Sequence, residues 1–109
     1  MSRSVEKAEA ARLTEIYRTL PAKKFALAQG LIIEAARLRA RCDALWEDLQ
    51  KNGETEQFSQ GSDQEPYERE RPSSRIYTAA NKAYQTIIRQ LNDMMPEDDD
   101  MNGGGFDVS

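Results

Sequence analysis

The residue types that most often carry out chemistry are sparse in this chain. Its 109 residues include no histidine, which removes the commonest general base and the commonest metal ligand. The one cysteine, Cys42, has no histidine partner for nucleophilic catalysis and no companion thiols for a zinc site. We therefore expect Cys42 to be a small buried apolar residue, and a single cysteine fits a reducing cytoplasm.

Two further patterns could bind ions or phosphates, but neither has the spacing that such sites need. Residues 97–100 form an acidic run without the alternating spacing of a calcium loop. Residues 103–105 are glycines without the Lys-Ser/Thr pair and the strand context of a phosphate-binding loop. The sequence thus predicts no catalytic residue, no metal site, no cofactor and no small-molecule substrate, and indicates that the protein is not an enzyme.

Basic side chains are the remaining candidates for a binding site. The candidate DNA-binding residues are Arg12, Arg18, Lys23, Lys24, Arg37, Arg39 and Arg41. Residues 1–51 hold ten basic and seven acidic side chains, whereas residues 52–72 hold two and six, and residues 96–109 hold none and five. The overall charge of −4 therefore conceals basic helices beside an acidic connection and an acidic tail. Contact with DNA phosphates is one interpretation, and a solvated face or ion pairs with Glu34 or Asp43 is the other.

Hydrophobic periodicity predicts helices, whose ends are set by proline and glycine. The first covers about residues 4–20 and stops at Pro21, so that residues 1–21 form an N-terminal helical segment. The second covers about residues 22–52 and has Gly53 as its C-cap.

A third helix is predicted over about residues 73–95, between Pro72 and Pro96, with Ser73 or Ser74 as its N-cap. The second and third helices carry matching heptad seams, which predict an antiparallel hairpin over residues 22–96. The seam residues are Ala28, Leu31, Ala35, Leu38, Cys42, Leu45 and Leu49 on the second helix, and Tyr77, Ala80, Tyr84, Ile87, Leu91 and Met94 on the third. The fold class is therefore all-α, a long helical hairpin plus a short N-terminal helix.

A second apolar stripe lies beside the first on the long helix, formed by Phe25, Ile32 and Trp46 at multiples of seven. One partner helix cannot cover both stripes, so either the N-terminal helix or another subunit covers the second. We expect a homo-oligomer, with the N-terminal helix packed on its own hairpin or swapped onto a neighbour. The predicted hairpin and oligomer interface comprises Phe25, Leu31, Ile32, Leu38, Leu45, Trp46, Leu49, Tyr77, Tyr84, Ile87 and Leu91.

The remaining segments are polar. Residues 53–72 predict a long structureless connection, in which Phe58 and Tyr67 anchor onto the helices or are exposed for a partner. Residues 97–109 predict a disordered acidic tail, because acid and glycine cannot bury enough apolar surface to order themselves. No apolar run reaches the roughly 20 residues that cross a bilayer, and the polar N-terminus does not have the pattern of a signal peptide. The expected location is the cytoplasm, without membrane contact.

Several segments together resemble the small terminase subunits of tailed bacteriophages and prophages, in a short-chain branch. They are Trp46-Glu-Asp-Leu-Gln-Lys-Asn-Gly, Phe58-Ser-Gln, Pro66-Tyr-Glu-Arg-Glu-Arg-Pro and Tyr84-Gln-Thr-Ile-Ile-Arg-Gln-Leu. Their order is a long helix with a tryptophan near its end, an Asn-Gly stop, a polar connection with Arg-Pro, and a second helix closed by Leu and Pro. The resemblance covers roughly residues 25–96, and its motifs are packing and turn residues rather than reactive groups.

The resemblance implies a non-catalytic DNA-packaging adaptor in the cytoplasm of the host cell. Such subunits bind double-stranded DNA, assemble into rings through a helical hairpin, and deliver the DNA to the large terminase subunit, which supplies the ATPase and nuclease. One departure is the N-terminal part, which is too short for a separate helix-turn-helix domain, so sequence-specific reading of DNA is not expected. The alternative is a protein-only helical interaction module, such as a phage-encoded regulator or inhibitor of a host protein.

Overall fold

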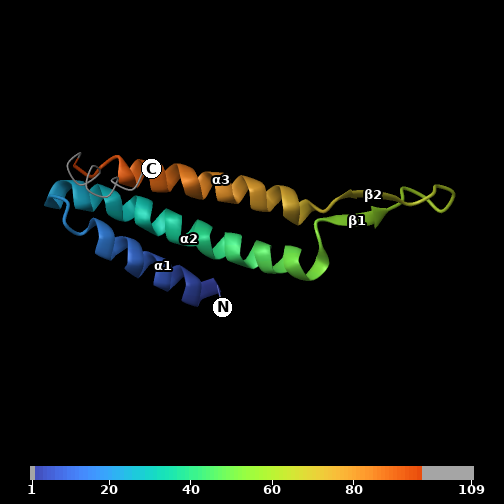
Figure 1. Cartoon of the computed structure of the whole chain (residues 1–109), viewed down its shortest axis with the longest axis horizontal. Helices are drawn as coiled ribbons and strands as arrows, with labels where there is room; N and C mark the ends of the chain where they lie inside the picture. The colour runs from blue at the N-terminus through green and yellow to red at the C-terminus, as the bar shows by residue number, and fades with distance from the viewer. Residues whose placement is uncertain (1, 97–109) are drawn as a thin grey trace, which may run out of the picture.

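The computed structural model describes residues 2–96, which are mostly helical (Figure 1). Its elements are the helices α1 (Ser2–Tyr17), α2 (Ala22–Asn52) and α3 (Pro72–Asn92), and the strands β1 (Thr55–Phe58) and β2 (Tyr67–Glu70). The prediction of a mostly helical fold is confirmed, and β1 and β2 add a small antiparallel sheet between α2 and α3 that was not predicted. The predicted acidic tail lies outside the described residues.

The helices α2 and α3 lie side by side and run in opposite directions (Figure 1). Gly53 ends α2 with a positive φ of 83°, and its N–H donates to the carbonyl of Leu49 over 2.8 Å. Pro72 occupies the first turn of α3, where its missing N–H leaves no bond unmade. Arg71 is the N-cap residue of α3, so the expectation that Ser73 or Ser74 caps this helix is wrong.

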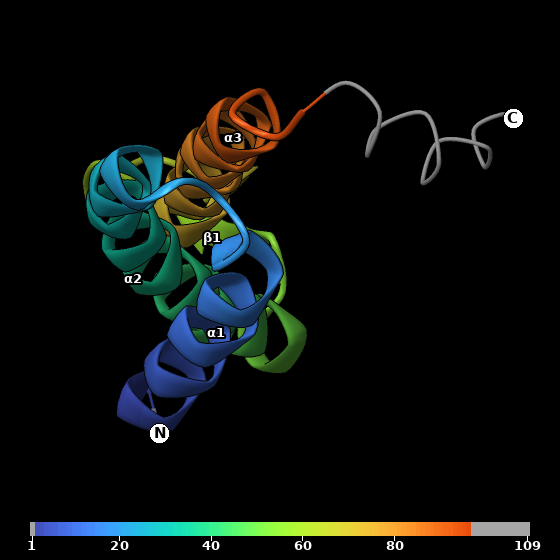
Figure 2. The same cartoon turned by 90° about the vertical axis from the view of Figure 1, so that its left-hand side faces the viewer.

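The helix α1 covers only part of the hairpin. Its 16 residues span about 24 Å, against about 46 Å for the 31 residues of α2. It folds back along the first half of α2, so three helices meet at the end that holds the linker of residues 18–21 (Figures 1 and 2). The other end of the hairpin, which we call the distal half, holds residues 40–52 of α2 and 72–83 of α3 and has no third helix over it.

The hydrophobic core lies where the three helices meet. α1 and the linker contribute Leu13, Tyr17 and Leu20, which are all buried, whereas Ile16, expected on the same face, is exposed. α2 adds Ala28, Ile32 and Ala35, and α3 adds Tyr84 and Leu91. The alanines of α2 allow the neighbouring helices to approach closely, while the large side chains of α1 and α3 fill the space between them.

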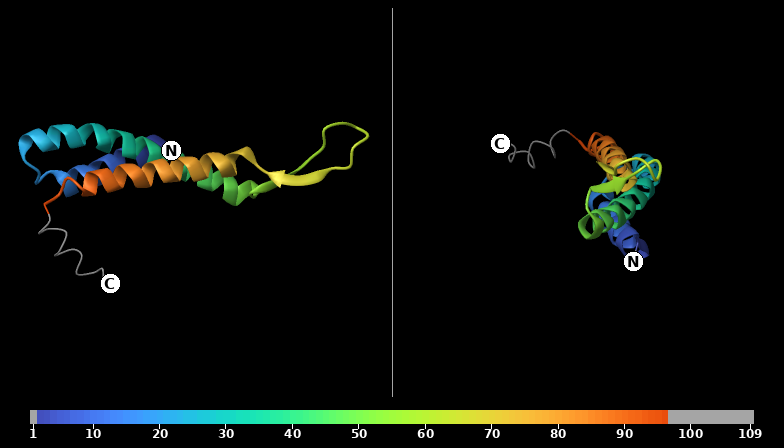
Figure 3. Two further views of the ribbon diagram at one scale, coloured as in Figure 1. Left: turned by 90° about the horizontal axis from the view of Figure 1, so that it is seen from above. Right: turned by 90° about the vertical axis from the view of Figure 1, so that its right-hand side faces the viewer.

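The two strands form an arm that projects past the ends of α2 and α3 along the long axis of the molecule (Figures 1 and 3). We call residues 54–70 the β-arm. Phe58 and Tyr67 face each other across the strands, with edge-to-face rings whose centroids are 5.8 Å apart. The prediction of a structureless connection is therefore wrong, and the two rings anchor each other rather than the helices. Tyr67 is 44% exposed, so contact of this ring with a partner stays a prediction.

The molecule is elongated, with principal extents of 64 × 32 × 20 Å and a radius of gyration of 19.0 Å. A compact domain of this length would have a radius of gyration of about 13 Å. No helix within residues 2–96 is both long enough and apolar enough to span a membrane.

Candidate functional site: the open side of the helical hairpin

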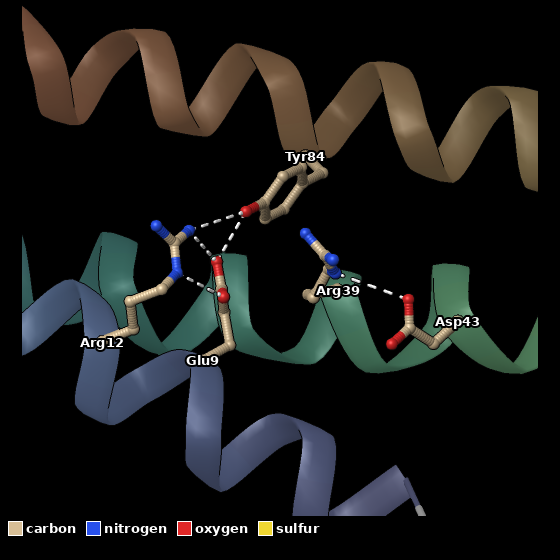
Figure 4. A network of polar contacts seen from close by, with 5 residues as sticks. All are labelled: Glu9, Arg12, Arg39, Asp43 and Tyr84. Carbon is tan, nitrogen blue, oxygen red and sulfur yellow. Dashed lines mark hydrogen bonds and ion pairs between the residues drawn. The ribbon is translucent and has the colours of Figure 1, made fainter.

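A buried carboxylate, that of Glu9, joins α1 to α3 (Figure 4). Glu9 accepts a 2.5 Å hydrogen bond from the hydroxyl of Tyr84, and Arg12 donates to both carboxylate oxygens over 2.9 and 2.8 Å. The Glu9 side chain is only 7% exposed. A buried charge is tolerated when it is paired and hydrogen-bonded, and Glu9 has both kinds of partner.

The same contacts shift the ionisation of both groups. The hydrogen bond from Arg12, helped by the one from Tyr84, holds the pKa of Glu9 below its ordinary value in spite of its burial. Burial, and then the hydrogen bond to Glu9, raises the pKa of Tyr84. At neutral pH the carboxylate is therefore ionised and the phenol protonated, which is the combination that the hydrogen bond requires.

Arg39 extends this network towards the distal half. Its guanidinium lies 5.8 Å from the centre of the Tyr84 ring, and its Nε is 3.4 Å from Asp43 (Figure 4). Arg37, Arg39 and Arg41 are all exposed, and their side chains alternate around the helix. Among these three, Arg39 is the one that contacts a described residue of α3.

An open pocket of about 240 Å³ begins beside this network and runs into the distal half. Residues of α2 and α3 that line it include Arg39, Asp43, Trp46, Tyr77, Asn81 and Tyr84. Arg39 and Tyr84 take part both in the pocket and in the network around Glu9, so the pocket continues the side of the hairpin on which α1 lies. α1 fills this side in the first half of the hairpin and leaves it open in the distal half.

Two aromatic rings form the apolar part of the pocket. Trp46 and Tyr77 pack against each other with centroids 5.5 Å apart and ring planes tilted by 39°. Tyr77 is half-buried, but Trp46 is 47% exposed even after this contact. Cys42 lies buried beside them, and burial raises the pKa of its thiol. The pocket therefore combines exposed aromatic surface with a paired arginine and aspartate, a composition suited to binding another protein chain.

The predicted interface residues divide into three groups. Four are buried, and these are Ile32, Leu49, Tyr84 and Leu91. Six are half-buried, and these are Phe25, Leu31, Leu38, Leu45, Tyr77 and Ile87. Trp46 alone among the eleven is exposed. The second stripe is thus divided, because Ile32 lies in the core that α1 completes, whereas Trp46 lies beyond the reach of α1.

The predicted DNA-binding residues do not form one patch. Arg12 is committed to Glu9, and the other ion pairs are Arg18 with Glu15, Arg37 with Glu34 and Arg39 with Asp43. Lys23, Lys24 and Arg41 are exposed, and they have no ion pair within residues 2–96. Lys23 and Lys24 are adjacent, but about 26 Å of helix separates Lys24 from Arg41, so Arg41 would contact a different phosphate from the two lysines.

A second polar cluster fixes the base of the β-arm. Asp48 accepts hydrogen bonds from Arg71 over 3.0 Å, Ser73 over 2.7 Å and Asn52 over 2.8 Å. These three donors, Arg71 first, lower the pKa of Asp48 to about 2. Arg71 also donates to the carbonyl of Gly53 over 2.9 Å, so one side chain holds the end of α2 and the start of α3 together.

Neither the cluster around Glu9 nor the one around Asp48 was predicted from the sequence, although the Glu9 cluster has a recognisable pattern. Glu9 lies four residues after Val5 and four before Leu13, so it replaces an apolar residue in the stripe of the first helix, with Arg12 three residues away. Asp48, by contrast, lies in the run Trp-Glu-Asp-Leu, where nothing distinguishes it from the neighbouring Glu47.

Within the part of the chain that the structure describes, no three acidic or cysteine side chains are gathered as a metal site would require. Comparison of the chain with family models, with curated proteins and with solved structures finds no match.

Proposed function

We propose that this protein is a non-catalytic adaptor that associates with copies of itself through the open side of its distal half. In the role suggested by its resemblance to small terminase subunits, the assembly binds double-stranded DNA and recruits the large terminase motor during packaging of a viral genome. The observation that carries the proposal is the half-exposed Trp46, packed against Tyr77 where α1 no longer covers the hairpin.

The residues on the open side of the distal half support self-association. An exposed tryptophan beside a second ring and a rim of paired charges resembles the buried anchors of protein interfaces. In the first half of the hairpin, the apolar residues of α1 already cover the same side of α2 and α3. A second copy would extend that packing over the distal half.

The oligomeric state of the full chain tests this part of the proposal. We expect sedimentation velocity at several protein concentrations to show an oligomer, and Trp46→Ser to shift it towards the monomer. Leu27→Ser is the matched control, because Leu27 is 71% exposed on the same helix but does not line the pocket. A wild-type protein that stays monomeric at high concentration would contradict the proposal.

DNA binding would rely on the cations that remain available after folding. One copy offers only three such cations, which are Lys23, Lys24 and Arg41. An assembly repeats them and could present a basic ring to the phosphates. We expect duplex DNA to bind at low salt, and the affinity to fall steeply between about 50 and 200 mM salt. Lys23→Glu with Lys24→Glu should weaken this binding and reduce its salt dependence.

One observation favours the second candidate function, a protein-only interaction module. Four of the seven predicted DNA-binding side chains are already engaged in ion pairs within the chain. In that case the open pocket and the β-arm would contact a host protein, and DNA would have no role. Absence of duplex binding at low salt, together with an intact oligomer, would favour this module over the packaging adaptor.

A further inference from the structure

A basic stripe follows the outer face of α3. Arg75, Lys82 and Arg89 repeat every seven residues, which places them within about 40° of one another around the helix over about 21 Å. All three are exposed, and they lie opposite the face that carries the buried Ala80 and Leu91. α3 has no acidic residue from Pro72 to Asn92, and Asp93 is the first to follow. We call these three residues the α3 stripe.

The charges of the α3 stripe are largely unneutralised. Arg75 has one distant ion pair, 3.7 Å from Glu70 at the base of the β-arm. Lys82 and Arg89 have no ion pair within the described residues. On α2, by contrast, two of the three arginines have acidic partners three or four residues away. The stripe therefore presents a row of three cations on one helix face, of which only Arg75 has an acidic partner within the described residues.

The β-arm has the opposite charge. Residues 54–70 hold six acidic side chains and one basic one, Arg69, which is paired with Glu56 over 2.7 Å. Asp63 and Glu65, near the end of the arm, are exposed and have no ion pair within the described residues. A two-stranded sheet of this size is only marginally stable in water on its own, so contact with another surface would stabilise it.

The position of the β-arm prevents it from neutralising its own stripe. The arm continues the long axis away from α3, and only its base reaches Arg75 (Figures 1 and 3). The eight residues from Glu54 to Gly61 can extend about 26 Å, which is close to the length of the stripe. The outer part of the arm therefore cannot reach the stripe of its own chain. A stripe of matching length and opposite charge would have to come from a second copy.

We propose that the β-arm of one copy docks along the α3 stripe of a second copy. This inference rests on the proposed self-association and gives it a direction, because the arm of one molecule meets a different surface on the next. Such a head-to-tail contact generates a closed ring when its rotation closes and a filament when it does not. The exposed charge pairs orient the contact and speed its formation, while the apolar surface around Trp46 contributes most of the affinity.

Charge exchange between the two surfaces tests this contact in the full-length chain. Lys82→Glu with Arg89→Glu reverses the stripe, and Asp63→Lys with Glu65→Lys reverses the outer arm. At low salt each double variant should raise the dissociation constant for assembly by at least about tenfold. The four changes combined should restore it to within about threefold of the wild-type value. Arg3→Glu with Lys7→Glu is the matched control, because it makes the same change in net charge at exposed cations on α1, outside both the stripe and the distal half.

The outcomes separate this inference from the proposal on which it rests. A monomeric wild-type protein would overturn both. An oligomeric wild-type protein whose stripe variant assembles normally, or whose combined variant is not restored, would overturn the arm contact alone. A stripe variant that assembles normally but loses affinity for duplex DNA would identify the stripe as a phosphate-binding face instead. Circular dichroism of each variant checks that the helices remain folded.

Discussion

The hydroxyl of Tyr84 on α3 donates a 2.5 Å hydrogen bond to the carboxylate of Glu9 on α1, across 75 positions of sequence. Arg12 holds the other side of the same carboxylate and lies 3.4 Å from the Tyr84 oxygen. This contact links the first helix to the last one. It therefore holds α1 against α3 as well as against α2.

Loss of the Tyr84 hydroxyl should weaken this link. We expect Tyr84→Phe to lower the free energy of unfolding by about 1–2 kcal/mol, since Glu9 would lose one partner while remaining buried. Tyr77→Phe is the control, because the Tyr77 hydroxyl has no hydrogen-bond partner among residues 2–96, and it should cost less than about 0.5 kcal/mol. Urea denaturation at one fixed protein concentration measures both, and equal losses would show that the bond is not stabilising.

The same carboxylate makes stability depend on acid. The pKa of Glu9 is lowered from 4.5 on folding, so its contribution is fully present above about pH 4.5 and is lost as the pH falls through the folded value. We expect the urea midpoint of the wild type to fall in this range, and Glu9→Gln to show a smaller fall because the titrating group is gone. Parallel curves for the two proteins would contradict this assignment. Asp48, whose pKa is lowered to about 2, contributes to the loss of stability only as the pH approaches that value.

The cluster around Asp48 should control the β-arm more than the helical core. We expect Asp48→Asn to weaken the bond to Arg71 and to speed amide hydrogen exchange in β1 and β2, while exchange around Leu13 and Leu91 stays slow. Glu47→Gln removes the neighbouring charge without touching the cluster and should leave the arm unchanged. Exchange that speeds equally throughout the protein would mean that the cluster supports the whole fold.

Two glycines in or next to α2 should respond in opposite ways to alanine. Gly53 has a φ of 83° and a ψ of 173°, a conformation that side chains disfavour, so Gly53→Ala should lower the free energy of unfolding by at least about 1 kcal/mol. Gly30 is inside the helix, and a Cβ there would meet nothing within 4 Å, so Gly30→Ala should raise it by about 0.5–1 kcal/mol. Urea denaturation compares them, and a loss at Gly30 would indicate that a partner packs closely on that position.

The helices were predictable because their signals are local. Pro21 and Gly53 lie at the two ends of α2, and the seam positions of α2 are buried or half-buried in the structure. The ends of α1 and α3 differ from the predicted ones by one to three residues, as expected where a helix end depends on tertiary contacts.

The sheet and the polar clusters were less accessible to sequence analysis. Each strand has four residues with one aromatic side chain, Phe58 or Tyr67, so no alternation stands out from a polar loop. The Glu9 and Asp48 clusters depend on partners 75 and 23 to 25 residues away, which periodicity within one helix does not reveal. The division of the second stripe between α1 and solvent likewise follows from the length and angle of α1.

The short reach of α1 has a further effect on the energetics of a single copy. The half of the hairpin beyond Glu9 has two helices and fewer buried side chains, so it should open by local unfolding at a lower free energy than the three-helix half. Under the proposed association, a second copy would bind only the closed form of this half and would suppress that fraying. Folding and association are then linked by mass action, and the melting temperature should rise with protein concentration.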